Sequence, residues 1–266
     1  MNNKFKMLLQ GCGLLMGMTA VSSLAGNITF NPPQDRINPG VHLEVAGSEM
    51  SFADYDHDGD IDWLARIDYQ GILYVVNNRG LDGSGYLSAP RSQIDWFIDD
   101  AEFADVNGDG WADIITASRG HGFRIRLNNQ LGGFTLNQTI AGSDFSPNQQ
   151  EWHFAVGDVE SDGDIDIIVS SYRTNPRYHV LVNDGTGTFS IGWQSPSVPN
   201  YQINWMDMAD LDGDGLPELI TLGSFNHYNI WQNNGDGTFT GRFAIDPINT
   251  GYSIGVQQSR SALGDV

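Results

Sequence analysis

The chain has 266 residues, of which 13 are Lys or Arg and 33 are Asp or Glu, so its formal net charge is −20. Hydrophobic residues make up 40% of the chain, which is enough for a packed core and excludes a disordered acidic tail. The acidity argues against nucleic acid as a partner and against direct membrane binding, because no excess of basic side chains can neutralise phosphates. The 32 glycines and the 11% of aromatic residues indicate a β protein with many tight turns.

Residues 1–25 are expected to be a signal peptide and not part of the fold. Lys4 and Lys6 precede an apolar stretch, and small residues fit a cleavage site after Ala25. A membrane anchor is the alternative, but glycines interrupt this stretch, which is barely long enough to span a bilayer. We therefore expect export to the periplasm, the cell surface or the extracellular space. Because Cys12 is the only cysteine, the mature chain has no disulfide and needs another source of stability.

An acidic eleven-residue motif occurs four times and begins a fifth time. The copies span residues 52–62, 103–113, 156–166 and 208–218, and the fifth starts at 263–266. The first motif Asp of successive copies are 51, 53, 52 and 55 residues apart, which is the length of one four-stranded propeller blade. We place the repeats at 49–99, 100–152, 153–204 and 205–259, with a fifth beginning at 260–266 and with 26–48 as a lead-in or outer strand.

A second landmark, an Asn-Asn or Asn-Asp pair, follows each motif at residues 77–78, 128–129, 183–184 and 233–234. Asn and the glycines that follow it favour tight turns between two strands. In each repeat, strand A then ends at the first Asp, strand B begins at the last acid, strand C leads into the Asn pair and strand D begins near the next Phe. No helical periodicity follows residue 25. The sequence thus predicts an all-β fold, a β-propeller of four-stranded antiparallel blades with four blades and a partial one, and no helices in the mature chain.

The motif has the pattern of a calcium loop. Counted from its first Asp, it has acids or an amide at positions 1, 3 and 5, Gly at position 6 and an acid at position 9, and calcium prefers six to eight oxygen ligands. Position 7 is expected to offer its carbonyl, so its side chain varies. The loops hold 17 of the 33 acids. We expect about four Ca²⁺ sites, with these ligands: Asp54, Asp56, Asp58, Asp60 and Asp62; Asp105, Asn107, Asp109, Trp111 and Asp113; Asp158, Glu160, Asp162, Asp164 and Asp166; Asp210, Asp212, Asp214, Leu216 and Glu218.

Two other structures could account for this acidic pattern. An EF-hand needs an acid at position 12 between two helices, and position 12 here is Ala65, Thr116, Val169 or Thr221, followed by strand-like sequence. The loops could also be Asp-Gly turns that bind no metal. Four copies of the motif in the same register favour metal loops over such turns. Glu160 is longer than the side chain usual at position 3, so the third loop fits the pattern least well.

The repeats resemble the FG-GAP/VCBS repeats of integrin-α-like β-propellers. Phe52-Ala53, Phe103-Ala104, Val156-Gly157, Met208-Ala209 and Leu263-Gly264 stand where that family has its Phe-Gly. The resemblance covers residues 49–266 and implies a propeller of usually seven blades, with calcium between strands A and B. It also implies functions that range from adhesion modules and lectin-like proteins to polysaccharide lyases. Because four repeats and a stub are present, either the chain is a truncated fragment or it closes in an unusual way.

A possible ligand face lies at the connections from strand B to C and from strand D to A, on the side opposite the acidic loops. Aromatic rings stack on sugars, and Arg binds carboxylate or sulfate. The alternative is that these side chains pack between blades or pair with nearby acids. The candidate residues are Arg119, His121, Trp152, His153, Tyr172, Arg173, Arg177, Tyr201 and His227.

Three functions fit these observations. The first is a secreted calcium-binding module for a glycan or a surface protein. The second is an enzyme such as a lyase for uronic-acid polysaccharides, in which His121, His153 or Tyr172 would act as acid or base and Arg173 or calcium would neutralise the carboxylate. The third is a structural repeat region of a larger surface protein. No nucleophile elbow, zinc spacing or phosphate-binding loop is present, so no catalytic residue is assigned.

Overall fold

The computed structural model describes residues 51–67, 71–79, 91–118, 121–141, 152–171, 178–196, 203–223 and 228–245. The expected signal peptide, the lead-in segment and the start of a fifth repeat lie outside these ranges. The described residues form strands, turns and bends and contain no helix. Accordingly, a search of these ranges for a helix that could cross a membrane finds none.

The strands form four sheets, each built from four strands that are consecutive in the chain. All pairings within the sheets are antiparallel, as predicted for propeller blades. Blade 1 contains β1 (Phe52–Ala53), β2 (Asp62–Ile67), β3 (Ile72–Val76) and β4 (Arg91–Asp95). Blade 2 contains β5 (Ile98–Ala104), β6 (Asp113–Ser118), β7 (Gly122–Asn128) and β8 (Phe134–Ile140). Blade 3 contains β9 (Trp152–Gly157), β10 (Asp166–Ser171), β11 (Tyr178–Asn183) and β12 (Phe189–Gln194). Blade 4 contains β13 (Ile203–Ala209), β14 (Glu218–Gly223), β15 (Tyr228–Asn233) and β16 (Phe239–Ile245).

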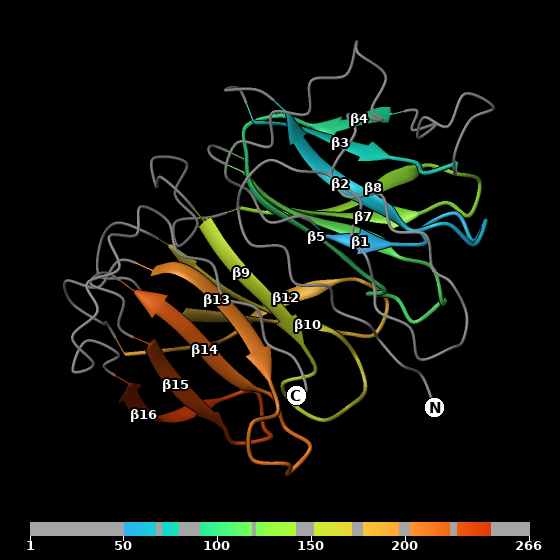
Figure 1. The fold of residues 1–266 in the computed structure, drawn as a ribbon. Helices are drawn as coiled ribbons and strands as arrows, with labels where there is room; N and C mark the ends of the chain where they lie inside the picture. The colour runs from blue at the N-terminus through green and yellow to red at the C-terminus, as the bar shows by residue number, and fades with distance from the viewer. Residues whose placement is uncertain are drawn as a thin grey trace, which may run out of the picture.

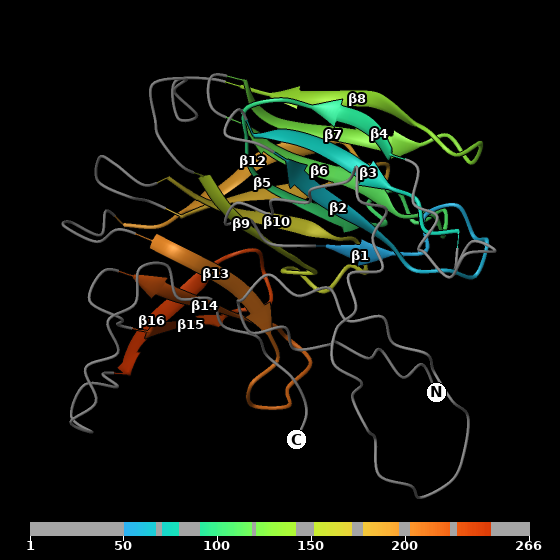
Figure 2. The ribbon, with the colours of Figure 1, turned by 45° about the horizontal axis from the view of Figure 1, so that its top comes forward.

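Consecutive blades touch through their first strands. β5 contacts β1 and β2, β9 contacts β5 and β6, and β13 contacts β9. Figure 1 shows β9 and β13 side by side, with blades 1 and 2 on one side of this pair and the outer strands of blade 4 on the other. In the turned view of Figure 2, β9 of blade 3 lies between β5 of blade 2 and β13 of blade 4. The all-β fold of propeller-like blades is therefore confirmed.

The three largest apolar clusters of the core lie between neighbouring blades. One joins blades 1 and 2 around Tyr55, Leu64 and Phe103, a second joins blades 2 and 3, and a third joins blades 3 and 4. Every residue of β6 and of β14 is buried. For β6 the reason is that blades 1 and 3 cover the two faces of blade 2. The outer strand β8 is mostly exposed instead. The three large clusters thus join neighbouring blades, while two small clusters lie within blade 1 and within blade 4.

Candidate metal loops

An acidic loop connects the first and second strands of every blade. We number the loops by blade: loop 1 is 54–62, loop 2 is 105–113, loop 3 is 158–166 and loop 4 is 210–218. The predicted sharp turn at position 6 is confirmed, because the glycines there have φ of 91°, 87°, 94° and 90°. Position 4 also has a left-handed backbone in every loop, which the sequence analysis missed. It is occupied by His57, Gly108, Ser161 and Gly213.

Two hydrogen bonds recur in all four loops and curl the backbone around the acids. The Asp at position 1 accepts a bond from the backbone N–H of the position-6 glycine, at 3.1, 2.8, 3.0 and 3.0 Å in loops 1 to 4. The Asp at position 5 accepts one from the backbone N–H of position 7, at 2.9, 2.9, 3.0 and 2.8 Å. The same turn geometry therefore places the alternate acids of every loop.

The acid at position 9 closes each loop from within the core. Asp62, Asp113, Asp166 and Glu218 are at most 2% exposed. In every loop this carboxylate accepts a bond from the backbone N–H of position 2, at 2.8 to 3.2 Å. Its other oxygen accepts the backbone N–H of Asn78, just after β3, in blade 1, and that of the last residue of strand C, Asn128 or Asn183, in blades 2 and 3. In blade 4 it accepts a bond from the side chain of Gln232. Because a carboxylate oxygen has two lone pairs, these bonds leave room for a cation.

Burial raises the pKa of the position-9 acids. The pKa rises from 3.8 to about 6 for Asp62 and for Asp113, chiefly because burial disfavours the charged form, while the backbone N–H bonds oppose the shift. The pKa values of Asp166 and Glu218 are raised for the same first reason, and the neighbouring acids of each loop add to the effect. A divalent cation would offset this cost by stabilising the ionised form.

Loop 1 fits a cation on the evidence of its own side chains. Carboxylate oxygens of Asp54, Asp56 and Asp58 lie within 4.8 Å of one another. One oxygen of Asp54 and one of Asp56, both Oδ1, are buried and have no hydrogen-bond partner among the described residues. Unpartnered buried carboxylate oxygens are costly, and a hard cation with oxygen ligands removes that cost.

The other loops fit a cation to different degrees. In loop 4, Asp210, Asp212 and Glu218 also come within 4.8 Å of one another. In the described ranges, no three acids of loops 2 or 3 come this close. Glu160 of loop 3 lies against the turn of the next blade, where a Cβ on Gly237 would be 3.2 Å from its Oε2. The calcium ligands assigned from the sequence stay a prediction in all four loops.

Three position-7 side chains pack against residues outside their own loops. Trp111 stacks on His57 of loop 1, with ring centroids 3.8 Å apart. Asp164 lies against the turn at Gly185, because a Cβ there would be 2.6 Å from its Oδ2. Leu216 lies against the corresponding turn at Gly235 in blade 4. One backbone turn is therefore compatible with three different environments of the position-7 side chain.

Asparagine side chains join loops 1 and 2 to the next blade. Asn128, at the end of β7, donates 2.8 Å to the Tyr55 carbonyl of loop 1 and 3.1 Å to the Ala112 carbonyl of its own loop. Asn183, at the end of β11, donates 2.7 Å to the Val106 carbonyl of loop 2 and 3.0 Å to its own loop. Both side chains are buried. We call Asn128 and Asn183 the asparagine bridges.

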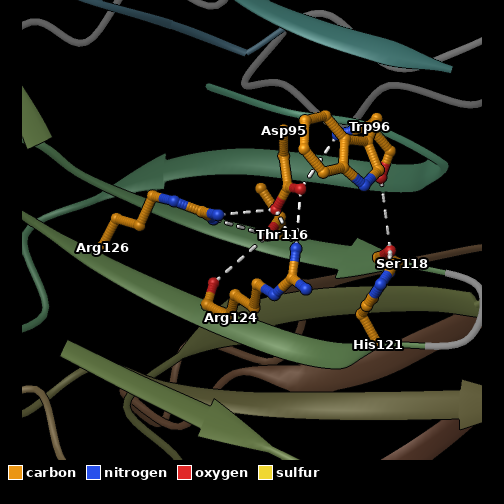
Figure 3. A network of polar contacts seen from close by, with 7 residues as sticks. All are labelled: Asp95, Trp96, Thr116, Ser118, His121, Arg124 and Arg126. Atoms are coloured by element: carbon orange, nitrogen blue, oxygen red, sulfur yellow. Dashed lines mark hydrogen bonds and ion pairs between the residues drawn. The ribbon is translucent and has the colours of Figure 1, made fainter. Parts of the chain in front are cut away.

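A charged network joins blades 1 and 2 toward the opposite end of the sheets (Figure 3). Asp95, at the end of β4, accepts bonds of 2.7 and 2.9 Å from Arg124 and one of 2.7 Å from Arg126, both on β7. Burial favours the neutral acid, but bonds from Arg124, the backbone of Trp96 and Arg126 together hold the pKa of Asp95 below its usual value. Arg126 also donates to Thr116 at 3.2 Å. These ion pairs join β4 of blade 1 to β7 of blade 2, and we call them the inter-blade clamp.

One residue assigned to the ligand face, Trp152, is buried in the core. Trp152 is 1% exposed and packs edge-on against Phe123, with ring centroids 5.4 Å apart, so its ring belongs to the core between blades 2 and 3. His121 and His153 are half-buried, and His121 Nδ1 lies 3.2 Å from Ser118 Oγ. Trp96 and Phe97, in the connection from β4 to β5, are about half exposed. The other residues assigned to this face, which lie outside the described ranges, are Arg119, Tyr172, Arg173, Arg177, Tyr201 and His227.

Comparison with family models identifies the repeats. The model of the FG-GAP-like repeat matches three times, over residues 105–169, 161–221 and 210–265. The chain belongs to this FG-GAP-like repeat family. Loop 1 lies before the first match, yet its two recurring turn bonds and its buried position-9 acid are those of loops 2 to 4. Blade 1 is therefore a fourth repeat of the same kind.

Among solved structures, the chain is similar to a lectin from Agrocybe aegerita whose structure concerns specific recognition of non-reducing terminal N-acetylglucosamine. The identity is 24%, the TM-score is 0.48, and the similarity covers 73% of this chain and 50% of the lectin. The chain thus spans about half the length of that protein. The comparison with curated proteins gives no match.

Proposed function

We propose that this FG-GAP-like propeller is an exported, calcium-stabilised binding module for a glycan or a surface protein. The observation that carries the calcium part is the pair of buried, unpartnered oxygens of Asp54 and Asp56 beside Asp58 in loop 1. Calcium fits this donor set because it accepts many oxygen ligands in flexible geometry. Magnesium demands a near-ideal octahedron and gives up water reluctantly, which suits a nine-residue loop less well.

The cation would supply stability that the mature chain cannot obtain from disulfides. A ligand that binds the folded state alone stabilises it by RT ln(1 + [L]/Kd). With extracellular-type affinities and millimolar calcium, this is about 1 kcal/mol per site. Over four loops the gain is comparable to a sizeable part of a domain's free energy of unfolding. The module would then present its surface on a scaffold that is rigid outside the cell.

Thermal unfolding with calcium and with EDTA tests the calcium part. We expect a higher midpoint with calcium, and Asp56→Asn should lose part of that gain because it weakens loop 1. Asp184→Asn, which changes an exposed acid outside the loops, should keep all of it. Terbium provides a second measurement, since Trp111 in loop 2 can sensitise its luminescence. Equal midpoints in both buffers, together with no terbium signal, would contradict the proposal.

Ligand binding and export need separate measurements. A glycan array probed with and without calcium tests carbohydrate binding directly. Amino-terminal sequencing of protein recovered from the medium or periplasm tests export, with Gly26 as the expected first residue after cleavage. An uncleaved chain retained in the cytoplasm would refute the export part without affecting the calcium part.

A further inference from the structure

A polar cavity lies at the acidic-loop end of the cleft between blades 1 and 2, away from the ligand face assigned from the sequence. Its volume is about 460 Å³, within the range of pockets that hold small ligands. Blade 1 contributes loop 1, the segment after β3 and one residue of β4, while blade 2 contributes the turn between β7 and β8. The lining residues are Tyr55, Asp56, Asn77, Arg79, Ser92, Gln130, Leu131 and Gly132.

The floor of the cavity is fixed by Asn77, which is 7% exposed. Its Nδ2 donates 3.3 Å to the hydroxyl of Tyr55 and also donates to Asp56. Its Oδ1 accepts a 3.0 Å bond from Nε of Arg79. Both N–H donors of the Asn77 amide are therefore used, and its Oδ1 accepts one bond, so the amide holds the three neighbouring polar groups in place.

Arg79 brings a positive charge to this cavity. Among the described residues the guanidinium makes one hydrogen bond, from Nε to Asn77, and this bond does not use the two terminal nitrogens. These nitrogens form the fork that binds carboxylate or sulfate with two parallel bonds. Because Nε is held, the fork is oriented before a ligand arrives, which lowers the entropy cost of binding.

The rim on the blade 2 side is an exposed apolar residue on a rigid turn. Leu131 is 89% exposed. Its backbone N–H donates 2.9 Å to Asn129, the N–H of Gln130 donates 2.8 Å to Asn128, and Gln130 has φ of 58°. The turn thus presents Leu131 beside the polar floor, an arrangement that suits the apolar C–H face of a sugar ring.

We propose that this inter-blade cavity binds an acidic sugar, with its carboxylate or sulfate on Arg79, its hydroxyls on the polar floor and its C–H face on Leu131. The inference rests on the proposed function in one respect. Asp56 lies in the cavity wall and in loop 1, so a cation in loop 1 would neutralise the nearest negative charge and favour an anionic ligand. Calcium should therefore strengthen binding of the sugar.

Isothermal titration of the full chain with D-glucuronate tests the proposal, with D-glucose 6-sulfate as the sulfate arm and D-glucose as the neutral match. We expect one acidic sugar per chain, bound about ten times more tightly than glucose, as for loss of one charge-assisted bond. Arg79→Gln should remove this preference for the acid. Leu131→Ala should weaken binding of every sugar, whereas Leu136→Ala, which changes an exposed leucine of β8 outside the cavity, should not.

Each outcome decides between the two proposals. Equal binding of glucuronate and glucose, or an unchanged preference in Arg79→Gln, overturns the acidic-sugar site, and a terbium signal in the same sample then leaves the calcium proposal standing. If glucuronate binding is lost in Arg79→Gln but unaffected by EDTA, the acidic-sugar site is supported and the expected effect of calcium on sugar binding is refuted. The unfolding midpoint of each variant should lie near that of the parent chain. A loss of sugar binding is then not caused by a loss of folding.

Discussion

Replacing Asn183 by Ala tests whether the asparagine bridges hold neighbouring blades together. The side chain is 3% exposed and makes four hydrogen bonds. Nδ2 donates to the carbonyls of Val106 and Ile165, at 2.7 and 3.0 Å, and Oδ1 accepts from the backbone N–H groups of Gly185 and Gly187, at 3.2 Å each. Each bond is worth about 0.5–1.5 kcal/mol net, and the groups left behind are partly buried. We expect a loss of about 3 kcal/mol, allowing for relaxation.

Urea unfolding and calorimetry of the calcium-loaded chain measure this loss. For a domain of this size, 3 kcal/mol corresponds to a fall in Tm of roughly 6–12 °C. Asn234→Ala is the matched control, because Asn234 lies in the corresponding turn of blade 4 and is exposed, and because its side chain bonds only to Thr238 and Thr240 among the described residues. It should lose less than about 1 kcal/mol. Asn183→Asp should be worse than Asn183→Ala, since a carboxylate would face two carbonyl oxygens.

The reasoning fails if Asn183→Ala and Asn234→Ala unfold within about 0.5 kcal/mol of each other with equal slopes against urea. That result would mean that the apolar layer between blades 2 and 3 carries the junction alone. An unequal slope would instead show that the blades separate in steps, which also follows when a bridge between them is removed.

Three further predictions follow from buried charge and from backbone geometry. In EDTA, stability should increase as the pH falls from 7 through about 6 toward 3.8, because Asp62 and Asp113 bind protons more tightly when folded. The free energy of unfolding should increase by at most about 3 kcal/mol per group. Calcium should oppose this increase because it binds the ionised form. Urea midpoints at pH 7 and pH 5, with and without calcium, measure both effects. Asp95→Asn should lower the free energy of unfolding by about 2–4 kcal/mol at pH 7, because Arg124 and Arg126 lose their counter-ion. Equal free energies of unfolding for Asp95→Asn and Asp184→Asn would show that these ion pairs do not stabilise the junction of blades 1 and 2. Gly122→Ala should cost about 1–2 kcal/mol more than Gly110→Ala, since both have positive φ but only at Gly122 would a Cβ lie 2.2 Å from the Ile140 carbonyl oxygen. Thermal melts of the pair check this difference.

The local features of the fold could be predicted because they depend on neighbouring residues. Strand B begins at the last acid of the motif, as at Asp113, and strand D begins at the following Phe, as at Phe189. Strand C ends at the first Asn of the pair, as at Asn128. Turn residues and alternating hydrophobicity set these boundaries within one repeat. Four copies of the motif in register made the same pattern visible four times.

Contacts between repeats could not be predicted in the same way. Trp152 was assigned to a ligand face because it stands in a connection, but blade 2 covers it with Phe123. The position-9 acids were read as metal ligands, and their burial under strand C appears only when strands A to C are packed together. The cavity at Arg79 is formed by two blades whose lining residues are 38 to 77 positions apart in the chain. Such long-range packing leaves no periodic signal in the sequence.

The asparagine bridges all point backward along the chain. Tyr55 receives its bond from a residue 73 positions later, and Val106 receives its bond from one 77 positions later. A polypeptide emerging from the ribosome therefore finishes one loop only after the following repeat has been made. Shortening the protein from its carboxyl end by whole repeats would leave the newly terminal loop without this donor. Assembly order and the tolerance to shortening should thus differ between the two ends of the chain.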